Sequence, residues 1–249
     1  MQPFGDAIIL CGGKSERMTY DKALITIEGR YLIDIIAEKL SYSFNNIRLS
    51  ADKKERFAHM GCEAIAGGEA NHTPFSADRR ERFAHMGREA IVGGEANYTP
   101  LNAGKKDRFS RFGLEVIEDG IAGNIGPAAG ICASLAHATT SYLFVIAGDM
   151  PYPNIAHIER MKQVLLEREL QDEILVPLNG EFLEPLYAFY RYDLATRFAA
   201  AISEGQLGVN RIIRSCNTYY FPESESRAFD KELAMFTNIN YLEDLERLR

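Results

Sequence analysis

A glycine turn followed by clustered basic residues carries the clearest chemistry in the sequence. Gly12 and Gly13 form the turn, and Lys14, Arg17 and Lys22 follow it. Without side chains in the turn, backbone N–H groups can approach a phosphate or a base closely. The basic side chains can neutralise a nucleoside triphosphate, whose charge must be offset before one of its phosphates is attacked. We interpret this segment as a triphosphate-binding loop.

Short glycine motifs often occur by chance, so a plain turn with solvated basic residues is the alternative. The extension through Arg17 and Asp21-Lys22 favours nucleotide binding. The sequence here contains neither GxxxxGK[ST] nor GxGxxG, so it predicts neither a Walker A loop nor a dinucleotide-binding turn.

An acidic residue follows the most apolar run of the chain. Tyr142–Ala147 reads YLFVIA, and Gly148 and Asp149 come next. Open α/β sheets bind ligands beyond the carboxyl ends of their strands, and a carboxylate there suits Mg²⁺ that bridges phosphates. The alternative is that Asp149 caps the helix expected from Asn154. Together with the glycine loop, the pattern favours a metal ligand.

Two further segments are candidates for substrate contacts. Asp119 follows an apolar run and can accept hydrogen bonds from the N–H groups of a base. Gly126 and Pro127 open a helix whose backbone can lie flat against that base. A surface turn is the alternative for both. Glu184-Pro185 precedes a strand, where it either lines an acceptor pocket or simply turns the chain.

Strands that alternate with helices must position these residues. The pattern predicts one α/β domain over residues 1–249, with a mainly parallel sheet covered on both faces. The expected strands are 7–11, 46–50, 142–147, 174–177 and 186–190, and the expected helices are 32–40, 130–138, 154–169, 193–203 and 241–249.

A tandem duplication interrupts this pattern. The segments Ser50–Phe75 and Ser76–Leu101 repeat with a period of 26 residues and share ERFAHMG and GGEAN, and a diverged third copy begins at Asn102. A solenoid needs three or more equivalent repeats, so we interpret 50–101 as an insertion at the sheet edge. The units after the first follow Thr-Pro, which suits an interior strand poorly. We therefore expect Ser50 to end the second strand and Leu114–Glu118 to form the edge strand.

Composition limits the classes of partner. The 249 residues carry a net charge of −7 with 46% hydrophobic residues, which argues against bulk binding to nucleic acid or to an anionic membrane. The four cysteines form no CxxC pair, and neither a signal peptide nor a run of about 18 apolar residues is present. We expect reduced thiols and a cytoplasmic location.

The chain resembles the molybdenum cofactor guanylyltransferases. The resemblance covers residues 7–24, 102–131, 142–152 and 236–245, including the LxGGxSxRM start, the DxP after a core strand and the FxNIN ending. It implies a three-layer, Rossmann-like fold of the nucleotide-diphospho-sugar transferase type. It also implies Mg²⁺, GTP and molybdopterin, together with molybdoenzyme maturation proteins as possible partners.

The resemblance assigns roles to particular residues. GTP contacts are implied for Leu10, Cys11, Gly12, Gly13, Lys14, Lys22, Asp119, Gly126 and Asp149, and for a second-strand residue that is Ser50, Ser76 or Asn102. Asp149 would also bind Mg²⁺, and Lys22, Arg17 and Asp149 would act in catalysis. Asn238 and Asn240 would lie on the molybdopterin side.

Thr19 replaces the usual glycine of the family, and Cys11 the usual alanine. A related enzyme that uses CTP or a sugar phosphate, and a non-catalytic nucleotide-binding protein, remain the alternatives.

The duplication gives a first test. Deletion of Ser50–Leu101 removes two whole units and puts Asn102 at the position of Ser50. We expect the shortened chain to fold and to keep its activity, because the third copy then supplies the strand end. Thermal unfolding and turnover, compared with the full chain, measure this. An insoluble or inactive deletion protein would show that the repeats are integral to the domain.

Overall fold

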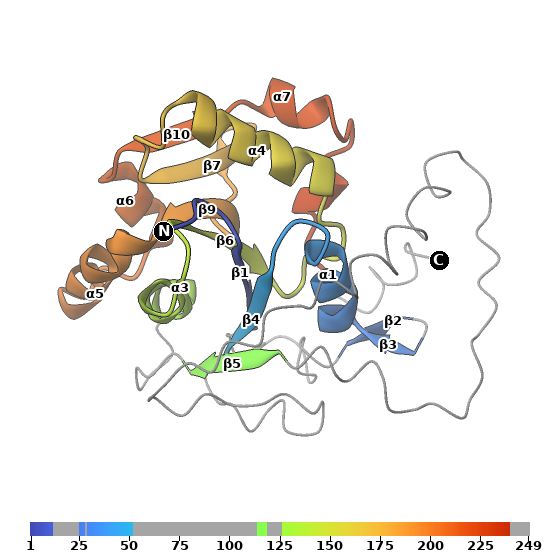
Figure 1. Ribbon diagram of the computed structural model, residues 1–249, viewed down its shortest axis with the longest axis horizontal. Coiled ribbons are helices and arrows are strands. Elements are labelled where there is room, and N and C mark those ends of the chain that lie inside the picture. Colours follow the sequence, from blue (N-terminus) through green and yellow to red (C-terminus); the bar gives the residue numbers. More distant parts are fainter. Residues whose placement is uncertain (12–24, 28, 52–113, 119–125, 240–249) are drawn as a thin grey trace.

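The central feature is an eight-stranded mixed sheet (Figure 1). The computed structural model describes residues 1–11, 25–27, 29–51, 114–118 and 126–239. The strand order is β10-β7-β9-β6-β1-β4-β5, and β8 pairs with β7. These strands are β1 (Asp6–Leu10), β4 (Asn46–Ala51), β5 (Glu115–Glu118), β6 (Tyr142–Ala147), β7 (Ile174–Asn179), β8 (Phe182–Leu183), β9 (Tyr187–Arg191) and β10 (Thr218–Phe221).

The α/β class expected from the sequence is confirmed. Strand β1 pairs in parallel with β4 and β6, β4 with β5, and β7 with β10. Strand β9 runs antiparallel to both β6 and β7. The sheet is therefore mainly parallel with a reversed strand near its middle, and this reversal brings the start of β9 to the edge where β6 ends.

Helices cover both faces of the sheet. One face packs on α1 (Leu32–Leu40) and α4 (Ile155–Glu167), and the other packs on α3 (Pro127–Ala136), α5 (Ala195–Ser203) and α6 (Val209–Arg214). All of β6 is buried, so its alternate residues enter opposite cores. Phe144 belongs to the first core and Val145 to the second. The apolar strand β6 thus contributes side chains to the cores on both faces of the sheet, as expected for a strand covered on both sides.

Several predicted boundaries need correction. Helix α3 begins at Pro127, three residues before the predicted start, because Gly126 has a φ of 73° and a proline suits the first helical position. A 3₁₀ turn, Tyr192–Leu194, precedes α5 where one helix from residue 193 was expected. Seven further described elements were not predicted from the sequence: β8, α6, β10, α7 (Glu223–Arg227), a 3₁₀ turn at Ala234–Phe236, and the two strands of a hairpin, β2 (Thr26–Ile27) and β3 (Arg30–Tyr31). The helix expected at 241–249 lies outside the described residues.

The strands that flank the duplication agree with the prediction. Strand β4 includes Ser50 and ends one residue later, at Ala51, and it pairs in parallel with the edge strand β5. Arg48 is buried, and its Nε lies 2.9 Å from Oε2 of Glu115, whose side chain is 28% exposed. This partly buried ion pair joins the two strands across the insertion. The repeat units from residue 52 lie outside the described residues.

A buried carboxylate aligns the central strands at the opposite, amino edge. Asp6 is 0% exposed and accepts hydrogen bonds from Asn46 Nδ2 at 2.8 Å, from Thr140 N at 2.9 Å and from the backbone of Thr139. Thr139 Oγ1 donates a further bond at 2.8 Å. The acceptor atoms of one side chain thus fix the starts of β4 and β6 relative to β1.

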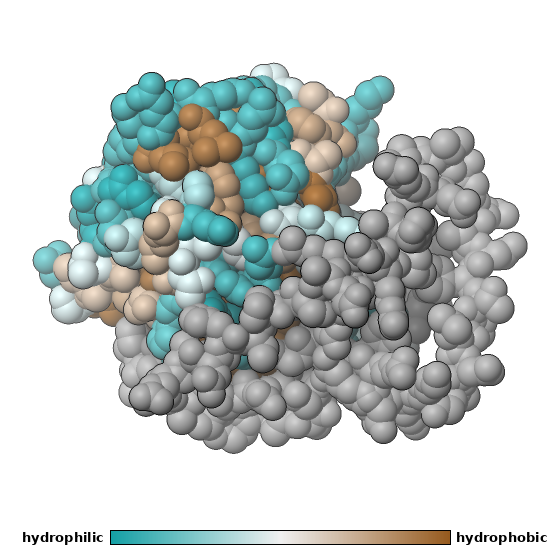
Figure 2. All heavy atoms as spheres, in the orientation of Figure 1, coloured by the Kyte–Doolittle hydropathy of each residue, from teal (hydrophilic) through white to brown (hydrophobic). Residues whose placement is uncertain are grey.

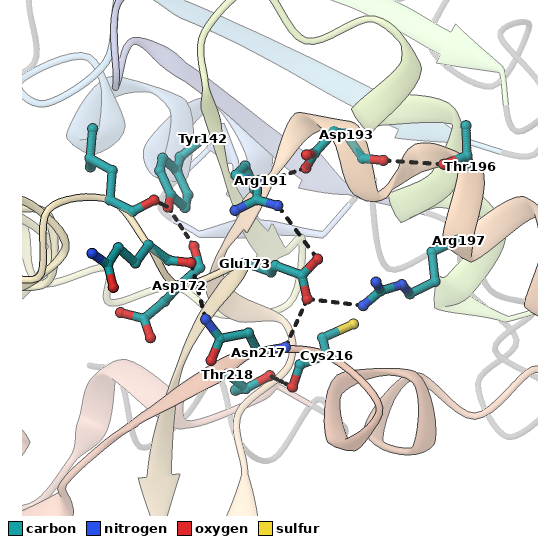
Figure 3. Close-up of polar contacts among 12 residues, drawn as sticks. Tyr142, Asp172, Glu173, Arg191, Asp193, Thr196, Arg197, Cys216, Asn217 and Thr218 are labelled. Carbon is teal, nitrogen blue, oxygen red and sulfur yellow. Dashed lines mark hydrogen bonds and ion pairs between the residues drawn. The ribbon is translucent and has the colours of Figure 1, made fainter.

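A second polar cluster closes the amino edge of the outer strands (Figure 3). Glu173 accepts hydrogen bonds from Arg197 Nη1 at 2.9 Å and from Asn217 N at 2.7 Å, and Arg191 lies 3.5 Å from its other oxygen. Glu173 and Asn217 directly precede β7 and β10, Arg191 ends β9, and Arg197 lies in α5. The two arginines and the Asn217 N–H group balance the charge of the partly buried Glu173 carboxylate, so we interpret the cluster as structural.

The face of the molecule drawn in Figure 2 is mostly polar in its described part. Figure 2 shows a largely hydrophilic face with a few hydrophobic groups, one of them beside α4 and β10. Among the described helices, none has the length and apolar character needed to span a bilayer.

The Asp6 cluster generates a stability prediction. Replacing Asp6 with alanine removes the buried acceptor of Asn46 Nδ2, Thr139 Oγ1 and Thr140 N, and Asn46 keeps only its bond to Thr139 Oγ1. We expect the free energy of unfolding to fall by about 2–4 kcal/mol. Urea titration measures it. Glu181→Ala, in an exposed turn, is the control and should change stability by less than about 0.5 kcal/mol. Equal effects of the two substitutions would contradict the role of Asp6.

Candidate active site at the carboxyl edge of the sheet

Three neighbouring strands end together at the carboxyl edge. In the register of the sheet, Leu10 lies opposite both Ser50 and Ala147. Cys11 N donates to Ser50 O at 2.8 Å, and Gly148 N donates to Leu10 O at 2.9 Å. The predicted contacts Leu10, Cys11 and Ser50 therefore lie side by side with the Gly148-Asp149 turn. Leu10, Cys11 and Ser50 are 7%, 8% and 1% exposed, so they form the floor of this edge.

Asp149 is partly buried and directly follows the end of β6. The proposed capping role is wrong, because the cap of α4 is Asn154, whose side chain accepts from His157 N at 3.0 Å. Asp149 therefore lies beyond the end of β6, five residues before the cap of α4. Its backbone oxygen accepts from Ile239 N at 2.8 Å, which brings the exposed Asn238 next to it in space.

Helix α1 supports the same turn from the side. Lys39 Nζ donates to Pro151 O at 3.3 Å and lies 5.4 Å from the centre of the Tyr152 ring. Burial lowers the pKa of Lys39. In the first turn of α1, burial raises the pKa of Asp34 to about 6, although Arg30 opposes the shift. The loop after Asp149 is therefore held by a helix that follows the glycine segment in the chain.

Only part of the predicted site can be placed. Gly126 lies at the start of α3, exposed, with a left-handed backbone that suits glycine. Of the three candidates for the second-strand contact, Ser50 lies in β4. The remaining candidates lie outside the described residues: Gly12, Gly13, Lys14, Arg17, Lys22, Ser76, Asn102, Asp119 and Asn240.

The described residues offer no cluster of three or more His, Cys, Asp or Glu side chains that would hold a metal alone. Asp149 carries carboxylate oxygens, which are the donors that hard divalent cations prefer. Among the described cysteines, Cys11, Cys132 and Cys216 form no disulfide.

The structure adds a polar pair that the sequence did not resolve. Glu184 follows β8 at the carboxyl edge, and its Oε1 accepts from Asn179 Nδ2 at 2.9 Å. It also begins a turn, because Tyr187 N donates to its carbonyl at 3.0 Å. The turn that was one of the two interpretations of Glu184-Pro185 is therefore present, and the pocket-lining role stays a prediction. The Asn179-Gly180 dipeptide, a common hairpin turn, was the available signal for its partner.

A family model decides between the classes of nucleotide-binding protein. The model of the MobA-like NTP transferase domain matches residues 7–79 and 81–219. The chain belongs to this family. It is therefore a nucleotidyltransferase by descent, and the edge that carries Cys11, Ser50 and Asp149 is the part of this MobA-like chain that merits tests of catalysis.

Similar proteins extend over nearly the whole chain. A probable molybdenum cofactor guanylyltransferase of Peptoclostridium acidaminophilum is 29% identical over 98% of this chain and 88% of its own. A molybdenum cofactor guanylyltransferase of Syntrophotalea carbinolica is 27% identical over 99% of this chain and 91% of its own.

Solved structures share the fold. The molybdopterin-guanine dinucleotide biosynthesis protein A of Archaeoglobus fulgidus superposes with a TM-score of 0.64 at 23% identity, covering 97% of this chain and 95% of that one. A 2-C-methyl-D-erythritol 4-phosphate cytidylyltransferase of Thermus thermophilus gives 0.52 at 11% identity, covering 96% and 95%. These neighbours are consistent with the three-layer nucleotidyltransferase architecture.

Gly148 generates a prediction about this edge. A Cβ atom there would lie 3.2 Å from both Leu10 O and Cys11 Sγ, so the end of β1 would have to shift. Because small displacements of positioned groups are costly to catalysis, we expect Gly148→Ala to lower kcat/KM by about tenfold or more. Steady-state kinetics measure it. Gly208→Ala is the control, since no described heavy atom lies within 4 Å of its Cβ position. Equal kinetics in both variants would contradict the tight approach.

Proposed function

We propose that this protein transfers GMP from GTP to the terminal phosphate of molybdopterin, giving the guanine dinucleotide cofactor and pyrophosphate. The observation that carries the proposal is the meeting of β1, β4 and β6 beside Asp149 in a MobA-like chain. The near full-length relatives named molybdenum cofactor guanylyltransferase support the choice of substrates.

The reaction needs little side-chain chemistry. An oxygen of the molybdopterin phosphate attacks the α-phosphorus of GTP, and the bond from that phosphorus to the bridging oxygen of pyrophosphate breaks. The attacking phosphate is already an anion at neutral pH, so no general base is required. Positioning and charge neutralisation then account for the rate, and Lys14, Arg17 and Lys22 are the residues that we assign to neutralisation.

Asp149 is the residue that we assign to Mg²⁺. Its partly buried carboxylate at the end of β6 is a hard oxygen donor, in keeping with the preference of this ion. When bound, the ion would neutralise phosphate charge and orient the triphosphate. Asp149 itself would fix the position of that charge relative to the ends of β1 and β4.

The other candidates divide between the two substrates. We assign Leu10, Cys11, Gly12 and Gly13 to the backbone cradle of the nucleotide, with Ser50 or Asn102 beside it and Gly126 near the base. Asp119 would accept from the N–H groups of guanine. Asn238 and Asn240 would face molybdopterin, and the contact of Ile239 with Asp149 supports this for Asn238. The cytoplasm is the proposed location, and maturation proteins of molybdoenzymes are the proposed recipients of the product.

One assay tests the whole proposal. Purified protein is incubated with molybdopterin, Mg²⁺ and GTP, CTP or ATP in turn, and pyrophosphate and the dinucleotide are measured. We expect turnover with GTP but not with CTP or ATP. Preference for CTP would indicate the related cytidylyl chemistry, and tight GTP binding without pyrophosphate release would indicate a binding protein.

Asp149 gives the residue-level prediction. Asp149→Asn keeps the shape of the side chain but removes its charge, so we expect turnover to fall by about 10²–10³-fold, the range for losing a preorganised electrostatic group. The rate of pyrophosphate release in Mg²⁺-GTP measures it. Asp193→Asn, at the exposed 3₁₀ turn before α5, is the matched control and should behave as wild type. A near-normal rate for Asp149→Asn would remove this residue from the metal site.

A further inference from the structure

Glu184 lies in a bulge of the chain that follows β7. In the ladder, Leu178 lies opposite Leu183, but Leu175 lies opposite Phe189. The segment that pairs with β7 therefore contains three more residues than a continuous antiparallel ladder would. These residues, 184–186, separate β8 from β9. Bulges often occur beside active sites, where they redirect a side chain.

The bulge adjoins the turn that carries Asp149. Leu186 O accepts from Ala147 N at 3.0 Å, which attaches the bulge to the end of β6. Strands β1, β4 and β5, which carry the proposed nucleotide contacts, lie on one side of β6, and β9 and β7 lie on the other. Glu184 and Asn179 are thus on the side of Asp149 that faces away from the glycine loop in the sheet order.

The Glu184 carboxylate has unused hydrogen-bonding capacity. Asn179 is its hydrogen-bond donor, and in the described part of the chain no lysine or arginine forms an ion pair with it. Burial raises the pKa of Glu184, and the Asn179 amide opposes the shift only in part. A carboxylate has about four lone-pair positions, so it can accept further N–H groups.

We propose that Glu184, positioned by Asn179, recognises the pterin ring of the acceptor by accepting hydrogen bonds from its 2-amino group and the adjacent ring N–H. This inference rests on the proposed function. The two donors lie on one edge of the ring, and a carboxylate accepts such a pair in a bidentate manner. Glu184 is accordingly a specificity residue that binds the acceptor, and the transfer step itself does not use it.

Glutamine at this position provides the first test. Glu184→Gln keeps the shape of the side chain and an acceptor for Asn179, but it loses the charge and one acceptor oxygen. With saturating Mg²⁺-GTP, we expect the KM for molybdopterin to rise by about 10- to 100-fold, the effect of losing a hydrogen bond to a charged group. The KM for GTP and the thermal unfolding temperature should stay unchanged. Glu181→Gln, an exposed carboxylate in the same hairpin, is the matched control.

A pair of inhibitors tests recognition directly. Pterin-6-carboxylate and lumazine-6-carboxylate differ in carrying a 2-amino or a 2-oxo group, and only the amino group donates to a carboxylate. Wild-type protein should bind the pterin more tightly, and Glu184→Gln should lose this preference because its amide can donate to the oxo group. Competition against molybdopterin measures both inhibition constants.

The outcomes separate the two proposals. Wild-type protein that does not guanylylate molybdopterin refutes the proposed function and the recognition of the acceptor with it. Active wild-type protein with an unchanged molybdopterin KM in Glu184→Gln, or with the same pterin preference in both proteins, refutes the assignment of Glu184 alone.

Discussion

The alignment of β4, β1 and β6 by the Asp6 carboxylate is the constraint on which the site depends. Four donors from Asn46, Thr139 and Thr140 converge on this buried group at the amino edge. A strand shifted by one residue would turn its side chains to the opposite face. Fixing the starts of the strands therefore also fixes where they end, at Leu10, Ala51 and Ala147, and so positions Cys11 and the Gly148-Asp149 turn that follow β1 and β6.

The reversed strand β9 gives the carboxyl edge two different halves. On the β1 side, the parallel strands β1, β4 and β5 all end at this edge, and the glycine segment follows β1 in the sequence. On the other side, β9 enters the sheet from the same edge, so residues that precede a strand, Glu184 among them, lie beside residues that follow one. A two-substrate enzyme can use this difference, because the two halves carry different groups on either side of the proposed centre at Asp149.

The sequence predicts the centre of the fold better than its outer parts. Tyr142–Ala147 was identifiable because burial on both faces makes it apolar throughout. Strand β10 was not, since three of its four residues are only partly buried or exposed and show no apolar pattern. The direction of β9 could not be predicted, because the alternation of buried and exposed side chains is the same for parallel and antiparallel strands. The position of Asp149 beyond the end of β6 could be predicted from the apolar run before it, whereas the Asn179–Glu184 contact depends on a bulge that no spacing rule specifies.

The position of the duplication between β4 and the edge strand β5 has a thermodynamic consequence. The entropy lost on closing a chain segment grows only with the logarithm of its length. Enlarging this connection by two 26-residue units, from about 11 to about 63 residues, costs about 1.5 kcal/mol even when the whole segment is counted as unstructured chain. Glu115, the partner of Arg48, has equivalents at Glu63 and Glu89 in the two units. Unequal recombination at this edge can therefore change the length of the gene by whole units while leaving an acidic strand residue available to close the sheet.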